Sequence, residues 1–264
     1  MIKYIASDLD GTLLPDNGTE IDPHVFDLIL KLKEKGIHFI AASGRQYQSM
    51  RRLFAPIRDE ISYISENGSL CTYKGKVICR GLIERSLGLE IIDAGREYSR
   101  TARPCHSLLS CETRHYTDSK DEYYIHHMRD VIHNEIEAVD DLHDINEPFL
   151  KFAFCDFKGI EKLAPFLKAR FSPRIQVAAA SAYWVDFIAP NANKGIALSR
   201  LLSSLGIDPK DGIAFGDQHN DIDMLKLAGT SYAVETAAPG VAGYADYVTA
   251  SVPGILETIL KSLE

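Results

Sequence analysis

The sequence predicts an α/β protein: a Rossmann-like core with a parallel sheet, interrupted by an inserted α+β domain. Buried strand patterns alternate with amphipathic helix patterns up to about residue 82 and again from about residue 188. Between these segments the regular alternation stops, and strands mix with helices as in a unit with a mostly antiparallel sheet. We therefore expect a core domain of residues 1–82 and 188–264 and an inserted domain of residues 83–187.

The N-terminal segment contains a strand–helix–strand unit. Residues 1–7 form an apolar strand pattern, and the polar residues 15–20 are expected to form a loop. Asp22 is a candidate N-cap of a helix that ends at Gly36, and residues 37–42 form the next buried strand. A strand–helix–strand order of this kind predicts neighbouring parallel strands with a right-handed crossover.

Further elements follow from the same patterns. In the core we expect strands at 61–64, 70–73, 76–80, 212–215, 231–234 and 246–248, the second and third forming a hairpin, and helices at 193–205, 224–227 and 254–263. In the insert we expect helices at 87–98, 123–131 and 160–171 and strands at 107–116, 149–157 and 174–187.

The composition limits the classes of function. The chain has 264 residues, of which 45% are hydrophobic and 25% charged, as is typical of globular proteins. Its net charge of −8 argues against binding of nucleic acid through a broad basic surface. No apolar run reaches the roughly 20 residues of a membrane span, and the first residues do not resemble a signal peptide. The five cysteines share no metal-ligand spacing, so we expect reduced thiols in a cytoplasmic protein.

Polar residues gather where core strands end or helices begin: Asp8 and Asp10, Ser43, Lys194, Asp217 and Asp221. Asp8 and Asp10 are two residues apart, so on a strand their side chains point the same way. Like charges held close together are costly unless a cation lies between them. In open α/β sheets, ligands bind at the carboxyl ends of the strands. We therefore expect a ligand site at this edge.

These residue types suit Mg²⁺ and a phosphoryl group. Carboxylate oxygens are the ligands that Mg²⁺ prefers, usually together with substrate phosphate and water. A lysine and a serine hydroxyl stabilise phosphoryl oxygens. One carboxylate can attack phosphorus and a second can transfer a proton to the leaving alcohol.

Four motifs, in order along the chain, resemble those of the haloacid dehalogenase superfamily: Asp8-Leu9-Asp10-Gly11-Thr12, Ser43-Gly44-Arg45, Asn193-Lys194-Gly195 and Gly216-Asp217-x-x-Asn220-Asp221. The insert between the second and third motifs resembles the C2-type cap of the Cof-type (class IIB) phosphatases, and Ser65-Glu66-Asn67-Gly68 also resembles that branch. Two stretches depart from the family pattern, namely Gln218-His219 and the turn at Thr236.

The resemblance implies a role for each matching residue. Asp8 is the nucleophile and Asp10 the general acid/base. The phosphoryl group is bound by Ser43, Gly44, Lys194 and Asn220. The Mg²⁺ site consists of Asp8, the backbone carbonyl of Asp10, Asp217 and Asp221, the last supporting the ion's water shell. Candidate substrate contacts are Arg45 and Asn67 in the core and Arg114, His115 and Tyr116 in the cap.

The function expected from these residues is Mg²⁺-dependent hydrolysis of a small phosphorylated metabolite, such as a sugar phosphate, through an aspartyl-phosphate. Two alternatives remain: a phosphotransferase or hexose-phosphate phosphomutase, and a catalytically silent ligand-binding protein on the same fold. We expect a monomer or weak dimer that binds neither nucleic acid nor membranes. The insert is rich in histidine, but no pair has the spacing of a zinc site, which favours surface histidines over a metal cluster.

Overall fold

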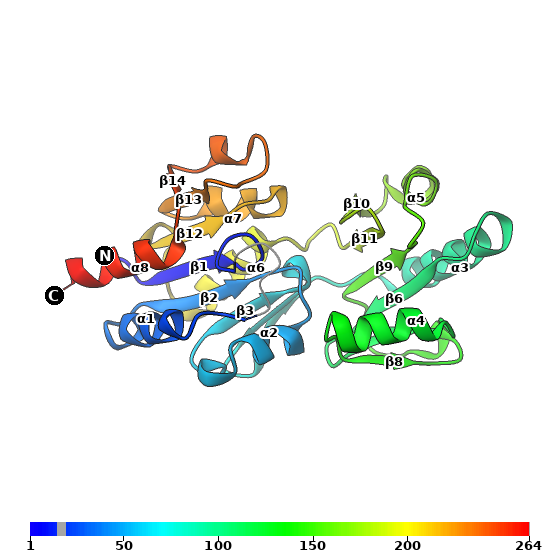
Figure 1. The fold of residues 1–264 in the computed structure, drawn as a ribbon, viewed down its shortest axis with the longest axis horizontal. Coiled ribbons are helices and arrows are strands. Elements are labelled where there is room, and N and C mark those ends of the chain that lie inside the picture. Colours follow the sequence, from blue (N-terminus) through cyan, green and yellow to red (C-terminus); the bar gives the residue numbers. More distant parts are fainter. Residues whose placement is uncertain (15–19, 264) are drawn as a thin grey trace. The chain divides into compact units, whose positions relative to one another are not determined.

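The computed structural model describes residues 1–14 and 20–263, so most of the loop expected at 15–20 lies outside the described residues. The chain divides into two compact units (Figure 1). The core unit comprises Met1–Arg80 and Asn193–Glu264, and the insert unit comprises Gly81–Ala192. The sequence placed these boundaries at 82/83 and 187/188.

The core unit contains, among its described residues, an eight-stranded sheet in the order β14-β13-β12-β1-β2-β3-β4-β5. Its pairings are parallel except those of β3 with β4 and β4 with β5, so the parallel sheet and the edge hairpin are as predicted. The strands are β1 (Tyr4–Asp8), β2 (His38–Ala42), β3 (Ser62–Ser65), β4 (Leu70–Tyr73), β5 (Lys76–Arg80), β12 (Gly212–Gly216), β13 (Thr230–Val234) and β14 (Tyr247–Thr249).

Helices cover both faces of this sheet, because successive strand residues point to opposite sides. Ile5 on β1 packs in one hydrophobic cluster with α1, α2 and α8, whereas its neighbours Tyr4 and Ala6 pack in another with α6 and α7. The helices are α1 (Pro23–Glu34), α2 (Tyr47–Leu53), α6 (Lys194–Leu205), α7 (Ile222–Leu227) and α8 (Val252–Ser262). Asp22 caps α1 and Asn193 caps α6, as predicted.

The strand order determines where a site can form. β1 lies between β12 and β2; the chain leaves β1 for β2 through α1 on one face of the sheet and enters β12 from α6 on the other face. Such a switch point leaves a crevice at the carboxyl ends of the central strands. Asp8 is the last residue of β1 and Asp217 directly follows β12, so the fold brings these two residues to neighbouring strand ends.

The insert unit contains a six-stranded sheet, counted over its described residues, in the order β10-β11-β9-β6-β7-β8. All neighbours are antiparallel except β7 and β8, so the mostly antiparallel sheet is as predicted. The strands are β6 (His106–Ser110), β7 (His115–Thr117), β8 (Ile136–Ala138), β9 (Lys151–Cys155), β10 (Gln176–Ala179) and β11 (Trp184–Ile188).

Two helices, α3 (Arg85–Thr101) and α5 (Leu163–Phe171), share a large hydrophobic cluster with one face of this sheet. Helix α4 (Glu122–His126) continues into a π-helical turn at His127–Val131, and both pack in a second cluster with Leu108 and Ala153. No helix within residues 1–14 and 20–263 combines the length and apolar character needed to cross a membrane.

Two expected strands of the insert unit are instead hairpins. Residues 107–116 turn after β6, where the amide of Cys111 donates to the carbonyl of Arg114. Residues 174–187 turn between β10 and β11, where the amide of Ala180 donates to the carbonyl of Trp184. Both predictions of a continuous strand were wrong. The first turn contains none of the glycine, proline, asparagine, aspartate or serine residues that mark most turns, and the second contains only Ser181.

Candidate active site

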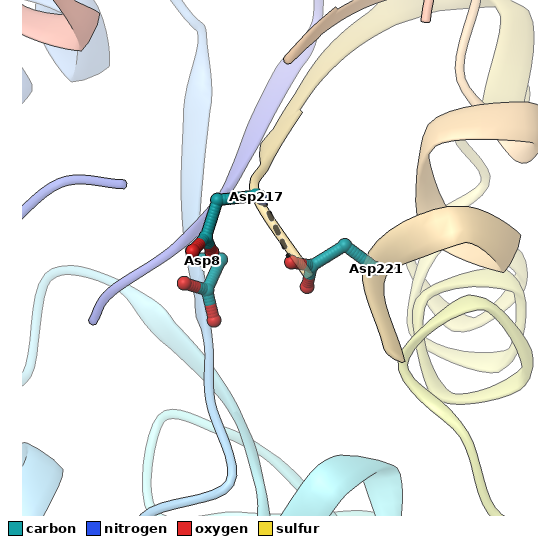
Figure 2. Close-up of side chains that lie close together, drawn as sticks. All are labelled: Asp8, Asp217 and Asp221. Atoms are coloured by element: carbon teal, nitrogen blue, oxygen red, sulfur yellow. Dashed lines mark hydrogen bonds between the residues drawn. The ribbon is translucent and has the colours of Figure 1, made fainter. Parts of the chain in front are cut away.

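Three buried carboxylates converge in the core unit (Figure 2). Asp8 ends β1, Asp217 follows β12, and Asp221 ends the 3₁₀ turn His219–Asp221 that leads into α7. One oxygen from each lies within 4.8 Å of the others. The residues are 5%, 4% and 0% exposed, respectively. This is the only group of histidine, cysteine, aspartate or glutamate in the described part of the chain with the spacing of a metal site.

Lys194, the first residue of α6, supplies one positive charge to this group. Its Nζ lies 2.5 Å from Oδ1 of Asp8 and 2.6 Å from Oδ1 of Asp221, and the residue is 1% exposed. Burial raises the pKa of Asp8 well above its ordinary value, although Lys194 opposes the shift. Burial alone lowers the pKa of Lys194, but Asp221 and Asp8 outweigh burial and raise it.

These charges fit a divalent cation. Three ionised carboxylates and one ammonium leave two negative charges in a buried place, an arrangement that is costly without a further cation. The ligand atoms are carboxylate oxygens only, as hard ions such as Mg²⁺ prefer. The residues present therefore fit the ion that the sequence implied.

Asp221 fixes the loop that carries Asp217. Its Oδ2 accepts the backbone N–H of Asp217 at 3.0 Å and that of Gln218 at 2.9 Å, while its Oδ1 contacts Lys194. From a neighbouring loop, the backbone N–H of Ala238 donates to the carbonyl of Asp217 at 2.8 Å. Thr236 in this second loop, where the sequence departs from the family pattern, is exposed.

Two side chains that the sequence analysis did not assign to the site hold the carboxylate of Asp217. Thr12 Oγ1 donates to Oδ1 and Gln218 Nε2 donates to Oδ2, both at 3.0 Å. Thr12 lies in the first motif, and that position was the signal available for it. Gln218 lies in a stretch that departs from the family pattern, but its amide supports a candidate metal ligand.

Asp10 lies beyond the end of β1 and does not join the buried carboxylates. Arg45 Nε lies 2.9 Å from Oδ2 of Asp10, and Arg45 Nη2 lies 2.5 Å from Oδ1. The side chain of Asp10 is 52% exposed. Ser43 Oγ lies 3.4 Å from Oδ2 of the same carboxylate. The strand rule led us to expect that Asp10 would point the same way as Asp8. Because β1 ends at Asp8, that rule does not extend to Asp10.

The candidate phosphate loops are joined to one another. The backbone N–H of Asn67 donates to the carbonyl of Ser43 at 3.1 Å, and the side chain of Asn220 donates to Oδ1 of Asn67 at 2.9 Å. A Cβ at Gly44 would lie 3.0 Å from that same oxygen, so a small residue lets Asn67 approach. The structure thus brings Asn67 together with Ser43, Gly44 and Asn220.

Gly68 permits the close approach of the Ser65–Gly68 segment to α6. Its φ is +94°, and a Cβ there would lie 2.2 Å from the carbonyl oxygen of Asn193 and 2.9 Å from the nitrogen of Lys194. No side chain fits at such distances, which explains the glycine. The 3₁₀ turn Glu66–Gly68 therefore packs against the residues that begin α6.

The three candidate substrate contacts of the insert unit are engaged within that unit. Arg114 Nη1 lies 2.5 Å from Oε2 of Glu137, and the hydroxyl of Tyr116 donates to Glu147. His115 is 2% exposed. The three residues are therefore not grouped with the buried carboxylates by any of these contacts, and their role as substrate contacts stays a prediction.

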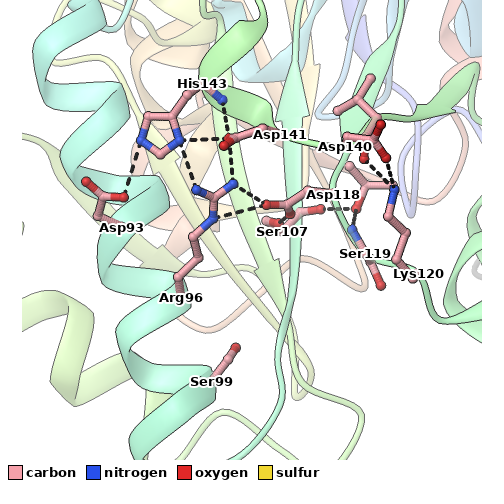
Figure 3. Close-up of polar contacts among 12 residues, drawn as sticks. Asp93, Arg96, Ser99, Ser107, Asp118, Ser119, Lys120, Asp140, Asp141 and His143 are labelled. Atoms are coloured by element: carbon pink, nitrogen blue, oxygen red, sulfur yellow. Dashed lines mark hydrogen bonds and ion pairs between the residues drawn. The ribbon is translucent and has the colours of Figure 1, made fainter.

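The insert unit also has a polar network centred on Arg96 of α3 (Figure 3). Arg96 Nη2 lies 2.7 Å from both Asp118 and Asp141. His143 lies 2.8 Å from Asp141 through Nδ1 and 3.2 Å from Asp93 through Nε2. The network borders a cavity of about 550 Å³. Carboxylates contact both ring nitrogens of His143, so this histidine links α3 to the neighbouring loops. His143 is one of the histidines in which the insert is rich.

The comparisons with known proteins identify the family. Residues 5–255 match the haloacid dehalogenase-like hydrolases, so the chain belongs to that family. It is 29% identical over 270 residues to the 5-amino-6-(5-phospho-D-ribitylamino)uracil phosphatase YbjI of Escherichia coli K12, covering 100% of this chain and 97% of that protein. It is 27% identical over 268 residues to phosphoglycolate phosphatase 1 of Saccharolobus solfataricus, with the same two coverages. A crystal structure from Eubacterium rectale superposes with a TM-score of 0.87 at 31% identity, covering 100% of this chain and 99% of that one.

The chain is therefore a phosphoric monoester hydrolase of the Cof-type, class IIB branch, acting on small phosphorylated compounds. Its mostly parallel sheet and its second, mixed sheet match the fold of solved structures of this family, in which the second sheet belongs to the cap.

Proposed function

We propose that this phosphatase is Mg²⁺-dependent, that it transfers the phosphoryl group first to Asp8 and then to water, and that its substrate is a phosphate ester of a small sugar or sugar alcohol. The observation that carries the proposal is the buried group of Asp8, Asp217 and Asp221, in which Lys194 balances only one of three carboxylates.

We assign a residue to each step. A carboxylate oxygen of Asp8 attacks phosphorus, and the bond from phosphorus to the substrate oxygen breaks. Asp10 gives its proton to the leaving alcohol and then takes one from the water that attacks the aspartyl-phosphate. The contact from Arg45 orients the carboxylate of Asp10. Lys194 and the loop of Ser43 and Gly44 bind the phosphoryl oxygens.

When bound at these carboxylates, Mg²⁺ would supply positive charge opposite the phosphoryl oxygens. We assign Asp8, the backbone carbonyl of Asp10 and Asp217 as its protein ligands. Both oxygens of Asp221 already accept hydrogen bonds, from Lys194 and from two backbone amides. We therefore propose that Asp221 supports the loop and the water shell of the ion and is not a direct ligand.

The relatives support the proposed substrate class. One is named for a phosphorylated ribityl compound and another for phosphoglycolate, and each is a phosphate ester on a short oxygenated carbon chain.

All residues assigned to the reaction steps lie in one unit of one chain, which supports a monomer or weak dimer. All five cysteines are free thiols, which supports a reducing, cytoplasmic location.

The test is phosphate release by the purified protein with Mg²⁺, across phosphorylated sugars, sugar alcohols, phosphoglycolate, nucleotides and pyridoxal phosphate. We expect release from sugar or sugar-alcohol phosphates, and loss of that release when EDTA removes the metal. Isomer formation without net phosphate release indicates a phosphomutase, and binding without turnover indicates a silent ligand-binding protein. Either result contradicts the proposal.

A further inference from the structure

Two cysteines of the core unit face each other outside the site described above. Cys71 on β4 and Cys79 on β5 are Cα partners in the antiparallel ladder, next to a register shift between Cys71 and Thr72, and both are free thiols. Directly opposed residues of antiparallel strands have Cα atoms about 4.5–5.5 Å apart, and disulfides span Cα distances of about 4.4–6.8 Å. We propose that Cys71 and Cys79 form an oxidation site that a hydroperoxide converts into a cross-strand disulfide.

The strands give the two thiols unequal access. β5 is at the end of the described sheet, and Cys79 on it is half-buried. Cys71 is 0% exposed and packs with Ala197, Leu198 and Leu201 of α6. A small oxidant in solution therefore reaches Cys79 first, and Cys71 reacts only through its neighbour.

The chemistry of the pair agrees with this order. The hydrogen bond with Cys71, supported by the guanidinium of Arg200, lowers the pKa of Cys79 to about 7 against the opposing effect of burial. The same hydrogen bond, together with burial, raises the pKa of Cys71. The shift favours the thiolate of Cys79 over that of Cys71, and the thiolate is the form that attacks.

The reaction balances with hydrogen peroxide as the oxidant. The Cys79 thiolate attacks one peroxide oxygen, the O–O bond breaks, and a sulfenic acid and hydroxide result. The sulfur of Cys71, held opposite Cys79 in the ladder, then attacks the sulfur of Cys79 while its proton passes to the sulfenic oxygen, which leaves as water. In sum, two thiols lose two electrons and two protons, and one peroxide becomes two waters.

The other cysteines with resolved shifts lack this activation. Burial raises the pKa of Cys105 to about 11 and that of Cys155 to about 12. Both therefore stay protonated near neutral pH, which makes them poor nucleophiles. Cys105 is half-buried like Cys79, so it is the matched control for access without activation.

A disulfide at this place lies close to the catalytic helix. α6 packs on β4 and β5, and its first residue is Lys194. The disulfide would join β4 and β5, the two strands against which α6 packs. The site is nevertheless testable without any activity, so its failure and the failure of the proposed function are distinguishable.

The experiment treats the reduced full-length protein with hydrogen peroxide, counts free thiols after denaturation, and maps unreduced tryptic peptides. We expect loss of two of the five thiols, recovery of both with dithiothreitol, and a disulfide between the peptides of residues 59–74 and 77–80. Cys79→Ala should abolish the reversible loss, Cys71→Ala should leave Cys79 oxidised without a cross-link, and Cys105→Ala should behave as wild type.

Three results overturn the proposal: wild-type protein that retains all five thiols, oxidation that falls first on Cys105, Cys111 or Cys155, and a disulfide that joins two chains. The wild-type peptide map decides between these outcomes without any variant, so a variant that fails to fold does not remove the test.

Discussion

Lys194 Nζ lies 2.5 Å from Oδ1 of Asp8, although the two residues are 186 positions apart. Both side chains are buried, and Lys194 also contacts Asp221. It is therefore a counter-ion in the folded protein as well as a candidate phosphate ligand. Its removal leaves buried carboxylates without that counter-ion, which links the stability of the core unit to the chemistry of the site.

Replacement of Lys194 by methionine should lower the free energy of unfolding by about 3 kcal/mol, because removing one partner of a buried ion pair leaves an uncompensated charge. The loss should shrink toward acid pH, since the raised pKa of Asp8 allows this carboxyl to become neutral. Urea unfolding in EDTA at pH 8 and pH 5 measures both effects.

The matched control is Lys3→Met. Lys3 also pairs with an aspartate, Asp211, at 2.8 Å, but its side chain is 49% exposed. Exposed pairs contribute about 0–1 kcal/mol, so this variant should lose less than 1 kcal/mol. Equal losses in the two variants would contradict the role given to the buried pair.

Gln218→Ala should raise the Mg²⁺ concentration that gives half-maximal activity by about tenfold, because residues that orient metal ligands affect metal affinity on this scale. The amide of Gln218 donates to Oδ2 of Asp217, and the side chain is exposed, so its loss should leave the fold unchanged. The measurement is phosphate release as a function of Mg²⁺ concentration.

His219→Ala serves as the control, since His219 is the next residue and is exposed too. It should show the Mg²⁺ dependence of wild type. If Gln218→Ala and His219→Ala behave alike, the hydrogen bond to Asp217 does not support the metal site.

His38 should make the core unit less stable in mild acid. Burial, helped by Lys33 and Lys74, lowers its pKa from 6.5 to about 4. The unfolded chain therefore binds a proton at a higher pH than the folded chain, and stability is lost as pH falls from about 6.5 toward 4. Between pH 7.5 and pH 5 this amounts to about 2 kcal/mol.

Comparison with His38→Gln isolates this residue from all other titrating groups. Glutamine does not titrate and can keep a hydrogen bond with Ser62, which lies 2.8 Å from Nε2 of His38. Unfolding free energies at the two pH values should fall by about 2 kcal/mol more in wild type than in the variant. Parallel pH profiles would show that the pKa of His38 is the same in the folded and the unfolded chain.

The sequence predicted the main parts of the site because they follow local rules. Asp8 and Asp217 follow buried strands, and Asn193 caps the helix that Lys194 begins, so strand order alone brings them to one edge. The contacts of Arg45 and Gln218 were not predictable in this way. Each depends on a side-chain direction after a strand has ended, where no periodicity applies.

The insert unit shows the same limit. The pattern for α3 was correct because its buried residues repeat at helical spacing. The turn between β6 and β7 was missed, because residues 111–114 contain no turn-forming residue that breaks the strand pattern. The bond from Thr12 to Asp217 joins residues 205 positions apart, and no pattern within a short window contains such a pairing.

We expect Asp8 to become phosphorylated during turnover. The most direct measurement is acid quenching during turnover of p-nitrophenyl phosphate with Mg²⁺, followed by peptide mapping for a phosphoryl group. We predict the group on Asp8 in wild type. In Asp8→Asn we predict neither the group nor phosphate release, with stability at least equal to wild type, because the buried group loses one of its two excess negative charges and Lys194 keeps its contact with Asp221. Turnover by Asp8→Asn, or a phosphoryl group on another residue, would contradict the account.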